Sequence, residues 1–203
     1  TQKGLVSITK SVGVTEIYNL SVDASDRRAI PVTFNEAGTI ESISIYHNGS
    51  SGNMLLAVYS DTNGYPASRI GVSPSTPVNT SAGWQTVSLA SPVPVASGQT
   101  VWLAWVFQNL TGIRYAAGTP GRALAPTHWS SGMPDAFGPA GLADYKYSVY
   151  CSLTPNNSSD TEKPVVTAFA VPQTSTSLTV AITSFSASDN KAVAGYMVTE
   201  SAS

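Results

Sequence analysis

Residues 83–108 read GWQTVSLASPVPVASGQTVWLAWVFQ, two apolar stretches separated by a segment that contains Pro and Gly. This pattern predicts two β-strands joined by a turn. In the second strand, Thr100–Phe107, apolar residues occupy both alternating faces, so we expect other elements to cover both sides. Trp102 and Trp105 point to opposite faces. We therefore predict the central strand of a β-sandwich, with one core-facing row formed by Val101, Leu103, Trp105 and Phe107.

The rest of residues 1–153 shows the same period of two and no sustained helical period. The expected strands are Leu5–Ile8, Ile17–Val22, Ala29–Phe34, Ile40–His47, Met54–Tyr59, Gln85–Leu89, Thr100–Phe107, Ile113–Ala116 and Tyr145–Ser152. Turn-forming pairs such as Asn48-Gly49 and Asn63-Gly64 separate them. The predicted fold class is all-β, a jelly-roll-like two-sheet sandwich.

A change of composition divides the chain after this sandwich. Residues 154–163, TPNNSSDTEK, contain turn formers and charges, which is typical of a linker. Residues 164–203 then contain three expected strands, Val165–Phe169, Leu178–Ile182 and Ala194–Thr199. Three strands are too few for an immunoglobulin sandwich of about seven strands. Residues 164–203 are therefore expected to form a partial immunoglobulin-like β domain.

Composition limits the partners that we expect. Only 11% of residues are charged and the net charge is −2. Without a basic cluster we expect no nucleic-acid partner, and without an apolar run of about 18 residues we expect no membrane insertion. Residues 1–4 lack a signal-peptide pattern, which indicates a mature chain or a fragment. Low charge and abundant Ser, Thr, Gly and Pro indicate an extracellular location, secreted or at the cell surface.

Motifs for catalysis are missing from the sequence. It contains no Gly-x-Ser-x-Gly, His-Glu-x-x-His, Cys-x-x-Cys or EF-hand pattern. His47 is expected to be a strand-end histidine with satisfied hydrogen bonds, and Cys151 a buried small hydrophobe. We therefore predict a protein that is not an enzyme. A polysaccharide hydrolase is the minority alternative, and it needs two carboxylates about 5 to 10 Å apart, with Asp61, Asp135 and Asp144 as candidates.

Two irregular segments supply the candidate ligand site. They are the loop Asp61–Arg69 and the segment Asn109–Asp144, which is long for a connection. An aromatic ring beside carboxylate and guanidinium groups can stack on a sugar and bond its hydroxyls. The predicted ligand-binding residues are Trp129, Asp135, Arg122, Tyr65, Asp61, Arg69 and His128. In the alternative interpretation, Trp129 folds back and caps the sandwich edge.

Two pairs of polar residues, Asp61 with Asn63 and Arg27 with Arg28, lead to further predictions. Asp61 and Asn63 offer hard oxygen ligands, so a structural calcium ion is the one cofactor that we consider. Arg27 and Arg28 are neighbours on an expected strand, and we expect one to face solvent and the other to need a partner.

Several stretches carry a resemblance to known modules. Residues 27–151 contain RRAIPVTFNEAGTIESISIYHNG, MLLAVYSDTNGYPASRI and YKYSVYCS, and this part resembles bacterial secreted β-sandwich accessory modules of the carbohydrate-binding-module type. Residues 164–203, which begin PVVTAFAVPQ, resemble the opening strands of bacterial immunoglobulin-like or fibronectin type III-like repeats. The resemblance implies a noncatalytic module that anchors a larger secreted or surface protein to polysaccharide or a cell-surface glycan.

A structural role is the alternative function. Three strands leave open edges, and a strand from another copy, such as Leu5–Ile8, could complete the sheet. This predicts self-association through open β edges in a surface adhesin or fibre subunit. For the carbohydrate-binding role, the slightly acidic surface favours neutral over strongly anionic polysaccharide.

Overall fold

The computed structural model describes residues 9–156, 164–176 and 179–188. The chain divides into two compact units, Thr1–Asn156 and Asn157–Ser203. Strands make up most of the described residues of the first unit and nearly half of those of the second, and the one helical segment among them is the short 3-10 turn η1 (Trp129–Ser131). The predicted all-β class is confirmed. The expected strands Leu5–Ile8 and Ala194–Thr199 lie outside the described residues.

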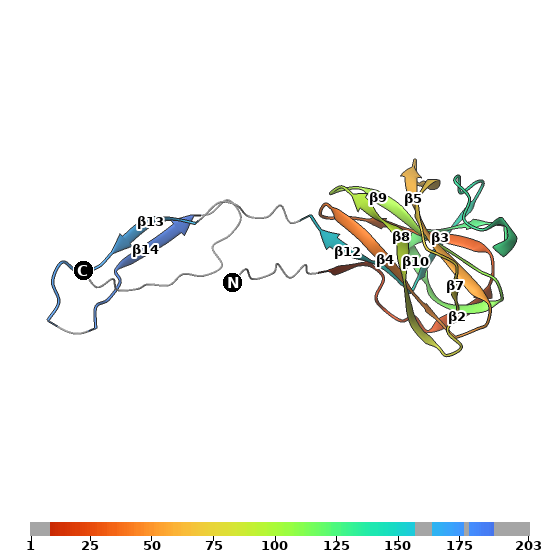
Figure 1. Cartoon of the computed structure of the whole chain (residues 1–203), viewed down its shortest axis with the longest axis horizontal. Coiled ribbons are helices and arrows are strands. Elements are labelled where there is room, and N and C mark those ends of the chain that lie inside the picture. Colours follow the sequence, from red (N-terminus) through yellow and green to blue (C-terminus); the bar gives the residue numbers. More distant parts are fainter. Residues whose placement is uncertain (1–8, 157–163, 177–178, 189–203) are drawn as a thin grey trace. The chain divides into compact units, whose positions relative to one another are not determined.

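The first unit is an antiparallel sandwich (Figure 1). Its strands are β1 (Lys10–Gly13), β2 (Leu20–Ala24), β3 (Arg27–Thr33), β4 (Gly38–His47), β5 (Asn53–Thr62), β6 (Tyr65–Val72), β7 (Thr76–Pro77), β8 (Gly83–Val95), β9 (Thr100–Phe107), β10 (Thr111–Ala125), β11 (Gly141–Tyr147) and β12 (Val149–Pro155). One layer pairs β1, β12, β4 and β8, and the other pairs β11, β10, β3, β9, β5 and β6. Strand β10 connects the layers, because Ile113 also pairs with His47 of β4.

The main core lies between these layers. The predicted row of β9 (Val101, Leu103, Trp105 and Phe107) is buried there, packed with residues of β4, β8 and β12 such as Ile43, Val87 and Cys151. Trp105 is 1% exposed. Each large apolar side chain buried in this way contributes about 1.5–3 kcal/mol to folding. The prediction that β9 is a central strand with this core-facing row is confirmed.

The opposite face of β9 has its own cover. Trp102, Ala104 and Val106 form an outer cluster with Tyr59 and with residues from segment 126–140, which crosses the outside of the sheet. Met133 and Phe137 are the buried residues of that segment. The two-sided apolar pattern of β9 therefore reflects one face in the main core and one under a loop.

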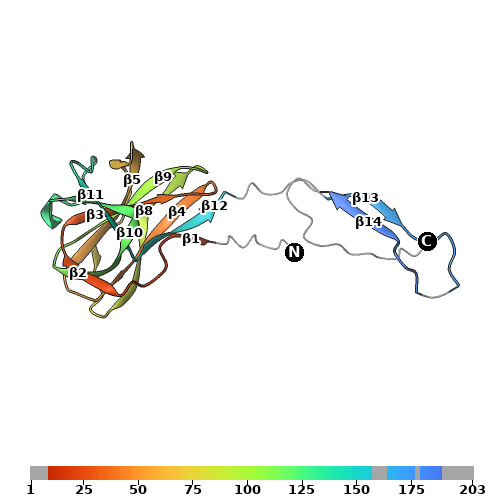
Figure 2. The ribbon, with the colours of Figure 1, turned by 180° about the vertical axis from the view of Figure 1, so that it is seen from behind.

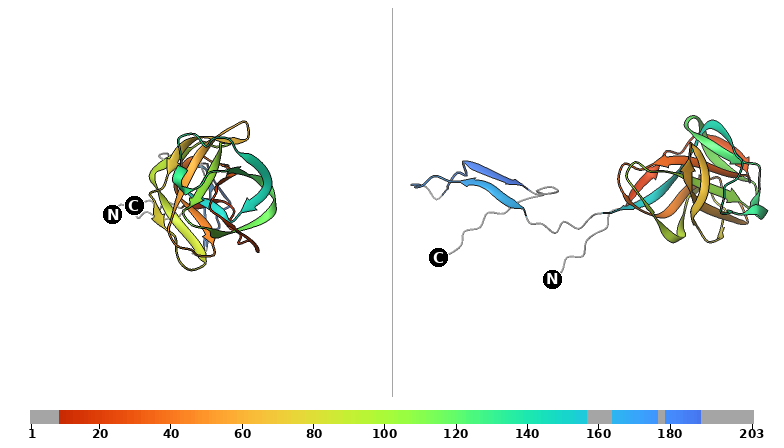
Figure 3. Two further views of the ribbon diagram at one scale, coloured as in Figure 1. Left: turned by 90° about the vertical axis from the view of Figure 1, so that its right-hand side faces the viewer. Right: turned by 90° about the horizontal axis from the view of Figure 1, so that it is seen from above.

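The prediction that Asn109–Asp144 is one long loop is wrong. Strand β10 occupies Thr111–Ala125 and pairs with β2, β3 and β11. The irregular part of the predicted loop is therefore limited mainly to residues 126–140, which connect β10 to β11. In Figure 3 the green and teal strands β10 and β11 form a curved flank of the unit. Beyond the predicted strand Ile113–Ala116, small residues such as Ala117 and Gly118 weaken the local strand pattern, and pairing on both edges of β10 outweighs that weakness.

Other strand boundaries also differ from the expectation. The strand expected over Tyr145–Ser152 breaks at Ser148, whose hydroxyl accepts a hydrogen bond from the Tyr18 amide at 3.1 Å, and the chain passes from β11 in one layer to β12 in the other. Figure 2 shows β1 beside β12, where β1 forms the edge of the layer that contains β12 and β4. Strand β8 runs on through Val95, because residues 93–95 pair with β4 after a register shift. Strands β1, β6 and β7 were not predicted.

The boundary between the units lies later than predicted. Thr154 and Pro155 belong to β12, opposite Thr39 and Gly38, and the Asn156 amide donates to the Ala37 carbonyl at 3.0 Å. In the second unit, β13 (Val165–Ala170) pairs antiparallel with β14 (Ser184–Ser188). The described residues of the expected strand Leu178–Ile182 are not in a strand, and the pairing partner lies a few residues later.

Candidate functional site

A groove of about 520 Å³ opens on the outside of the first unit, where the cover of segment 126–140 ends. Its volume lies within the range of about 300–1,000 Å³ that is typical of ligand sites. It is lined by Pro31, Asp61, Gly64, Thr100, Trp102, Gly121, Leu142, Ala143 and Asp144. The groove is therefore bounded by the β5–β6 turn on one side and the β10–β11 pair on the other, with β3 and β9 between them.

The floor is built from paired strands. Pro31 of β3 lies opposite Trp102 of β9, and Thr33 and Thr100 are joined by a 2.8 Å hydrogen bond between their hydroxyls. Pro31 has no N–H to donate, and its ring gives an apolar surface. The floor therefore combines apolar surface with one hydroxyl.

Asp61 is the best-positioned polar group of the groove. Its Oδ1 accepts a 2.7 Å hydrogen bond from the indole Nε1 of Trp102, and its Oδ2 accepts one from the Gly64 amide at 3.2 Å. Asn63 and Gly64 adopt positive φ values of 54° and 77°, which this tight turn needs. An ionised carboxylate has about four acceptor positions, so Asp61 keeps capacity for a ligand hydroxyl.

The other wall comes from β10 and β11. Arg122 of β10 pairs with Ala143 of β11, after an irregularity between Ala117 and Arg122. Leu142 is 46% exposed, and Asp144 is exposed as well. This wall thus presents an apolar side chain and a second carboxylate to the groove.

The predicted site residues are distributed over several places. Asp61 lines the groove, and Tyr65 follows Gly64 at the start of β6 with 49% of its surface exposed. Arg69 Nη2 lies 2.5 Å from Asp135 Oδ1, and Arg69 Nη1 donates to the Met133 carbonyl. Asp135 and Arg69 therefore form an ion pair, and their contact ties segment 126–140 to β6.

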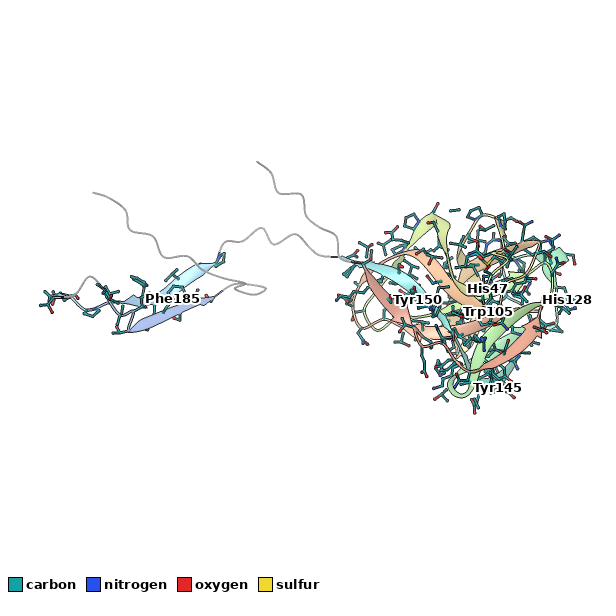
Figure 4. All side chains as sticks on the ribbon, turned by 90° about the horizontal axis from the view of Figure 1, so that it is seen from below. His47, Trp105, His128, Tyr145, Tyr150 and Phe185 are labelled. Carbon is teal, nitrogen blue, oxygen red and sulfur yellow. The ribbon has the colours of Figure 1, made fainter. Side chains whose placement is uncertain are left out.

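The remaining predicted residues lie in other surroundings. Trp129 is half-buried and packs against the outer cluster, as the capping alternative proposed. His128 lies at the surface of the unit (Figure 4), with Nδ1 3.7 Å from Asp26 Oδ1. The guanidinium of Arg122 lies 5.6 Å from the ring centroid of Tyr145. The structure therefore places Arg122 with tyrosines of the β10–β11 pair.

The expectation that one of Arg27 and Arg28 faces solvent is wrong, since they are 3% and 8% exposed. Arg27 donates to the carbonyls of Phe137 at 2.5 Å and Gly132 at 3.3 Å. Arg28 donates to the Tyr147 hydroxyl at 2.8 Å. Both faces of β3 are covered, so the terminal nitrogens of the two arginines donate to protein acceptors instead of water, whereas their Nε atoms are buried without a hydrogen-bond partner.

His47 and Cys151 are buried residues with structural roles. His47 is buried, accepts from the Gly49 amide at Nδ1 and contacts Gln85 Oε1 at Nε2, at 3.0 and 2.9 Å. Cys151 is buried as predicted, and burial raises its pKa to about 12. Among the described residues, no group of three or more His, Cys, Asp or Glu side chains could hold a metal ion. Of the candidate calcium ligands, Asp61 lies in β5 opposite Pro66, and Asn63 lies in the β5–β6 turn.

Sequence reasoning missed part of the groove. The alternation pattern assigns Trp102 to packing alone, and Pro31, Thr100 and Leu142 carry no signal of exposure. Asp144 is visible as a carboxylate, but nothing in the sequence joins it to Asp61. The pairing of β10 with β11 brings Asp144 to the groove, and no local pattern announces that register.

The described residues contain no helix with the length and apolar character needed to cross a bilayer. A scan against protein-family models finds no family that matches this chain. A search of curated proteins finds no relative that matches it either.

Proposed function

We propose that the first unit is a noncatalytic module that binds a neutral polysaccharide in the groove and anchors a larger extracellular protein to it. The observation that supports this most is Asp61, a carboxylate held at 2.7 Å by the Trp102 indole and open to a groove of about 520 Å³. A fixed acceptor beside apolar surface matches the alternation of hydroxyls and C–H groups on a sugar.

The lining suggests how a sugar would be held. Asp61 and Asp144 would accept hydrogen bonds from hydroxyls, while Pro31 and Leu142 would contact C–H surfaces. Trp102 is only 3% exposed, so it supports Asp61 rather than serving as an open stacking surface. With no large exposed ring in the lining, we expect dissociation constants from micromolar to millimolar, about −4 to −8 kcal/mol.

Binding fits these carboxylates better than hydrolysis does. Glycoside hydrolysis requires one carboxyl group that an apolar, poorly solvated environment keeps protonated as the acid, beside a second that serves as base or nucleophile. Asp61 already accepts hydrogen bonds from Trp102 and Gly64, and Asp144 is exposed. Both groups are suited to accepting hydrogen bonds from ligand hydroxyls, which is all that binding needs.

A glycan array on the full chain, followed by titration calorimetry with the best neutral glycan, tests the proposal. Asp144→Asn and Leu142→Ala should each weaken binding at least fivefold. The matched controls are Asp23→Asn on β2 and Leu110→Ala, both exposed and outside the groove lining, and they should bind as the wild type does. Binding that is unchanged in Asp144→Asn and Leu142→Ala would exclude this groove.

One observation favours the alternative of a self-associating surface protein. Val165, Val166 and Phe169 of β13 in the second unit are 61%, 57% and 49% exposed. Apolar strand surface of this kind is a typical site of strand pairing between copies. Under this alternative, sedimentation of the full chain should show concentration-dependent association that a Val165→Thr, Val166→Thr double variant abolishes. A monomer at every concentration would contradict it.

A further inference from the structure

A second pocket, of about 180 Å³, lies between β2, β3, β10 and β11, and we call it the arginine–tyrosine pocket. Its lining consists of Val22, Arg28, Tyr115, Arg122, Tyr145 and Tyr147. Two of these six side chains are cationic and none is acidic. The lining differs from that of the groove, which has two carboxylates and no cation. The two pockets are therefore suited to different ligands.

The charge of the two arginines is incompletely balanced. Arg28 Nη2 pairs with Asp26 Oδ2 at 3.1 Å, and that carboxylate also lies 3.7 Å from His128. Arg122 makes no ion pair with any described residue, and its guanidinium faces the Tyr145 ring at 5.6 Å. One carboxylate therefore serves Arg28, and the pocket keeps the positive charge of Arg122.

Hydrogen-bonding capacity is also unused. The Nε atoms of Arg28 and Arg122 are buried and without a hydrogen-bond partner. Tyr147 accepts the bond from Arg28 Nη1 as a neutral phenol, because burial raises the pKa of its hydroxyl. The terminal nitrogens of Arg122 are not among the buried atoms and make no hydrogen bond with a described residue, so they are the donors that an incoming acceptor can reach.

The tyrosines define the shape around these donors. The ring centroid of Tyr115 lies 5.6 Å from that of Tyr145, with the two rings nearly perpendicular, and 5.8 Å from that of Tyr147. Tyr145 is 38% exposed and marks the surface of the unit in Figure 4. The volume is smaller than that of a typical drug-sized site, so the pocket suits one charged group and the few atoms that carry it.

We propose that the arginine–tyrosine pocket binds the carboxylate of a small organic anion, with a uronic acid as the fitting sugar. Arg122 supplies the charge and forked donors, Arg28 adds a donor from β3, and Tyr145 contacts the ring that bears the carboxylate. This site is separate from the neutral-glycan groove and does not depend on the proposed function.

Ligand-observed NMR and calorimetry on the full chain test the pocket with glucuronate, glucose and acetate. Glucuronate should bind, glucose should show no binding that depends on Arg122, and added salt should weaken glucuronate binding. Acetate binding as tightly as glucuronate would mean that the carboxylate alone is recognised, and weaker acetate binding that the ring contributes. Either result supports an anion site.

The decisive variant is Arg122→Gln, which should weaken glucuronate binding at least tenfold, whereas Arg122→Lys should retain part of it. Arg114→Gln is the matched control, because Arg114 also lies on β10 and faces a tyrosine, Tyr46, at 6.0 Å, yet does not line the pocket. It should bind within twofold of the wild type. Asp144→Asn, which tests the groove, should not weaken glucuronate binding. No glucuronate binding at about 10 mM, or equal binding by Arg122→Gln and wild type, would overturn the proposal.

Discussion

The indole of Trp102 donates a 2.7 Å hydrogen bond to Asp61 Oδ1, which joins the outer cluster of the sandwich to the wall of the groove. Trp102 is 3% exposed, so its position is set by packing. The carboxylate of Asp61 is in turn set by the indole and by the Gly64 amide. Packing under one part of the sheet therefore orients a polar group in the neighbouring part.

The first prediction concerns this hydrogen bond. Trp102→Phe removes the donor and should lower the free energy of unfolding by about 1.5–3 kcal/mol, the range for hydrogen bonds to charged groups. Asp61→Asn keeps an oxygen acceptor for the indole and should cost less. Urea denaturation of both variants measures the difference, and a Trp102→Phe variant as stable as wild type would show that the bond is not important for folding.

Trp105 provides a test of the central strand. It is 1% exposed in the main core and lies 5.1 Å from the Tyr147 ring. Trp105→Ala should lower the free energy of unfolding by about 3 to 5 kcal/mol, because it leaves a cavity. Chemical denaturation measures this, and Leu110→Ala, at a residue that is 67% exposed, is the control with little expected change. Equal stability of Trp105→Ala and wild type would contradict the assignment of β9 to the core.

Arg27 should hold segment 126–140 on the sheet. It donates to the carbonyls of Phe137 and Gly132, and its guanidinium lies 4.9 Å from the Phe137 ring. In Arg27→Met, hydrogen exchange should become faster at the amide of Phe137, which donates to Ala67, while the amides of β4 keep their protection. Faster exchange everywhere would indicate global destabilisation instead of release of this segment.

His47 should make stability depend on pH. Its Nδ1 accepts from the Gly49 amide, and burial lowers its pKa below the ordinary value of 6.5. Between the folded pKa and 6.5 the unfolded chain binds more protons, so stability is complete above pH 6.5 and falls as pH decreases through that window. Thermal unfolding between pH 7.5 and 5 measures the loss, which is about 1.4 kcal/mol for every pH unit that separates the folded pKa from the unfolded one.

The variant His47→Gln should lose this component of the pH dependence. Leu110→Ala, at a residue that is 67% exposed and not titratable, is the control and should keep the wild-type profile. The same slope in His47→Gln and wild type would show that other groups cause it.

Cys151 should be unreactive in the folded protein. It is 0% exposed, and burial raises the pKa of its thiol to about 12, so almost no thiolate exists at pH 8. Mass spectrometry after iodoacetamide treatment should show no modification of the native chain and complete modification in denaturant. Rapid modification under native conditions would mean that β12 opens readily at this position.

Strands whose two faces have clear roles could be predicted from sequence. Thr100–Phe107 is predicted with its observed bounds, because its apolar residues are consecutive and the flanking Gly and Gln end the pattern. Strand β10 is predictable only over Ile113–Ala116, because its remaining residues are mostly small, without a clear alternation, and pair with three different strands. A strand that forms through pairing with adjacent strands can lack the alternation of apolar and polar residues by which a strand is predicted.

Candidate ligand residues could be predicted only one at a time. The Asp61–Gly64 turn is visible in the sequence, because Asp, Asn and Gly are the residues that such a turn requires. That Asp61 shares a groove with Asp144, and that Arg122 joins Arg28 among tyrosines, depends on strand pairing between distant parts of the chain.

The sequence by itself determined the all-β class, the central strand β9, the burial of Cys151 and the turn at Asp61. Each of these follows from the order of neighbouring residues, through side-chain alternation or backbone preference. Tertiary structure alone decided that residues 126–140 cover the outside of the sheet, that both Arg27 and Arg28 are buried, and which side chains line each pocket. Those features arise from register and packing between strands far apart in sequence, and local periodicity carries no information about which distant strand becomes the neighbour.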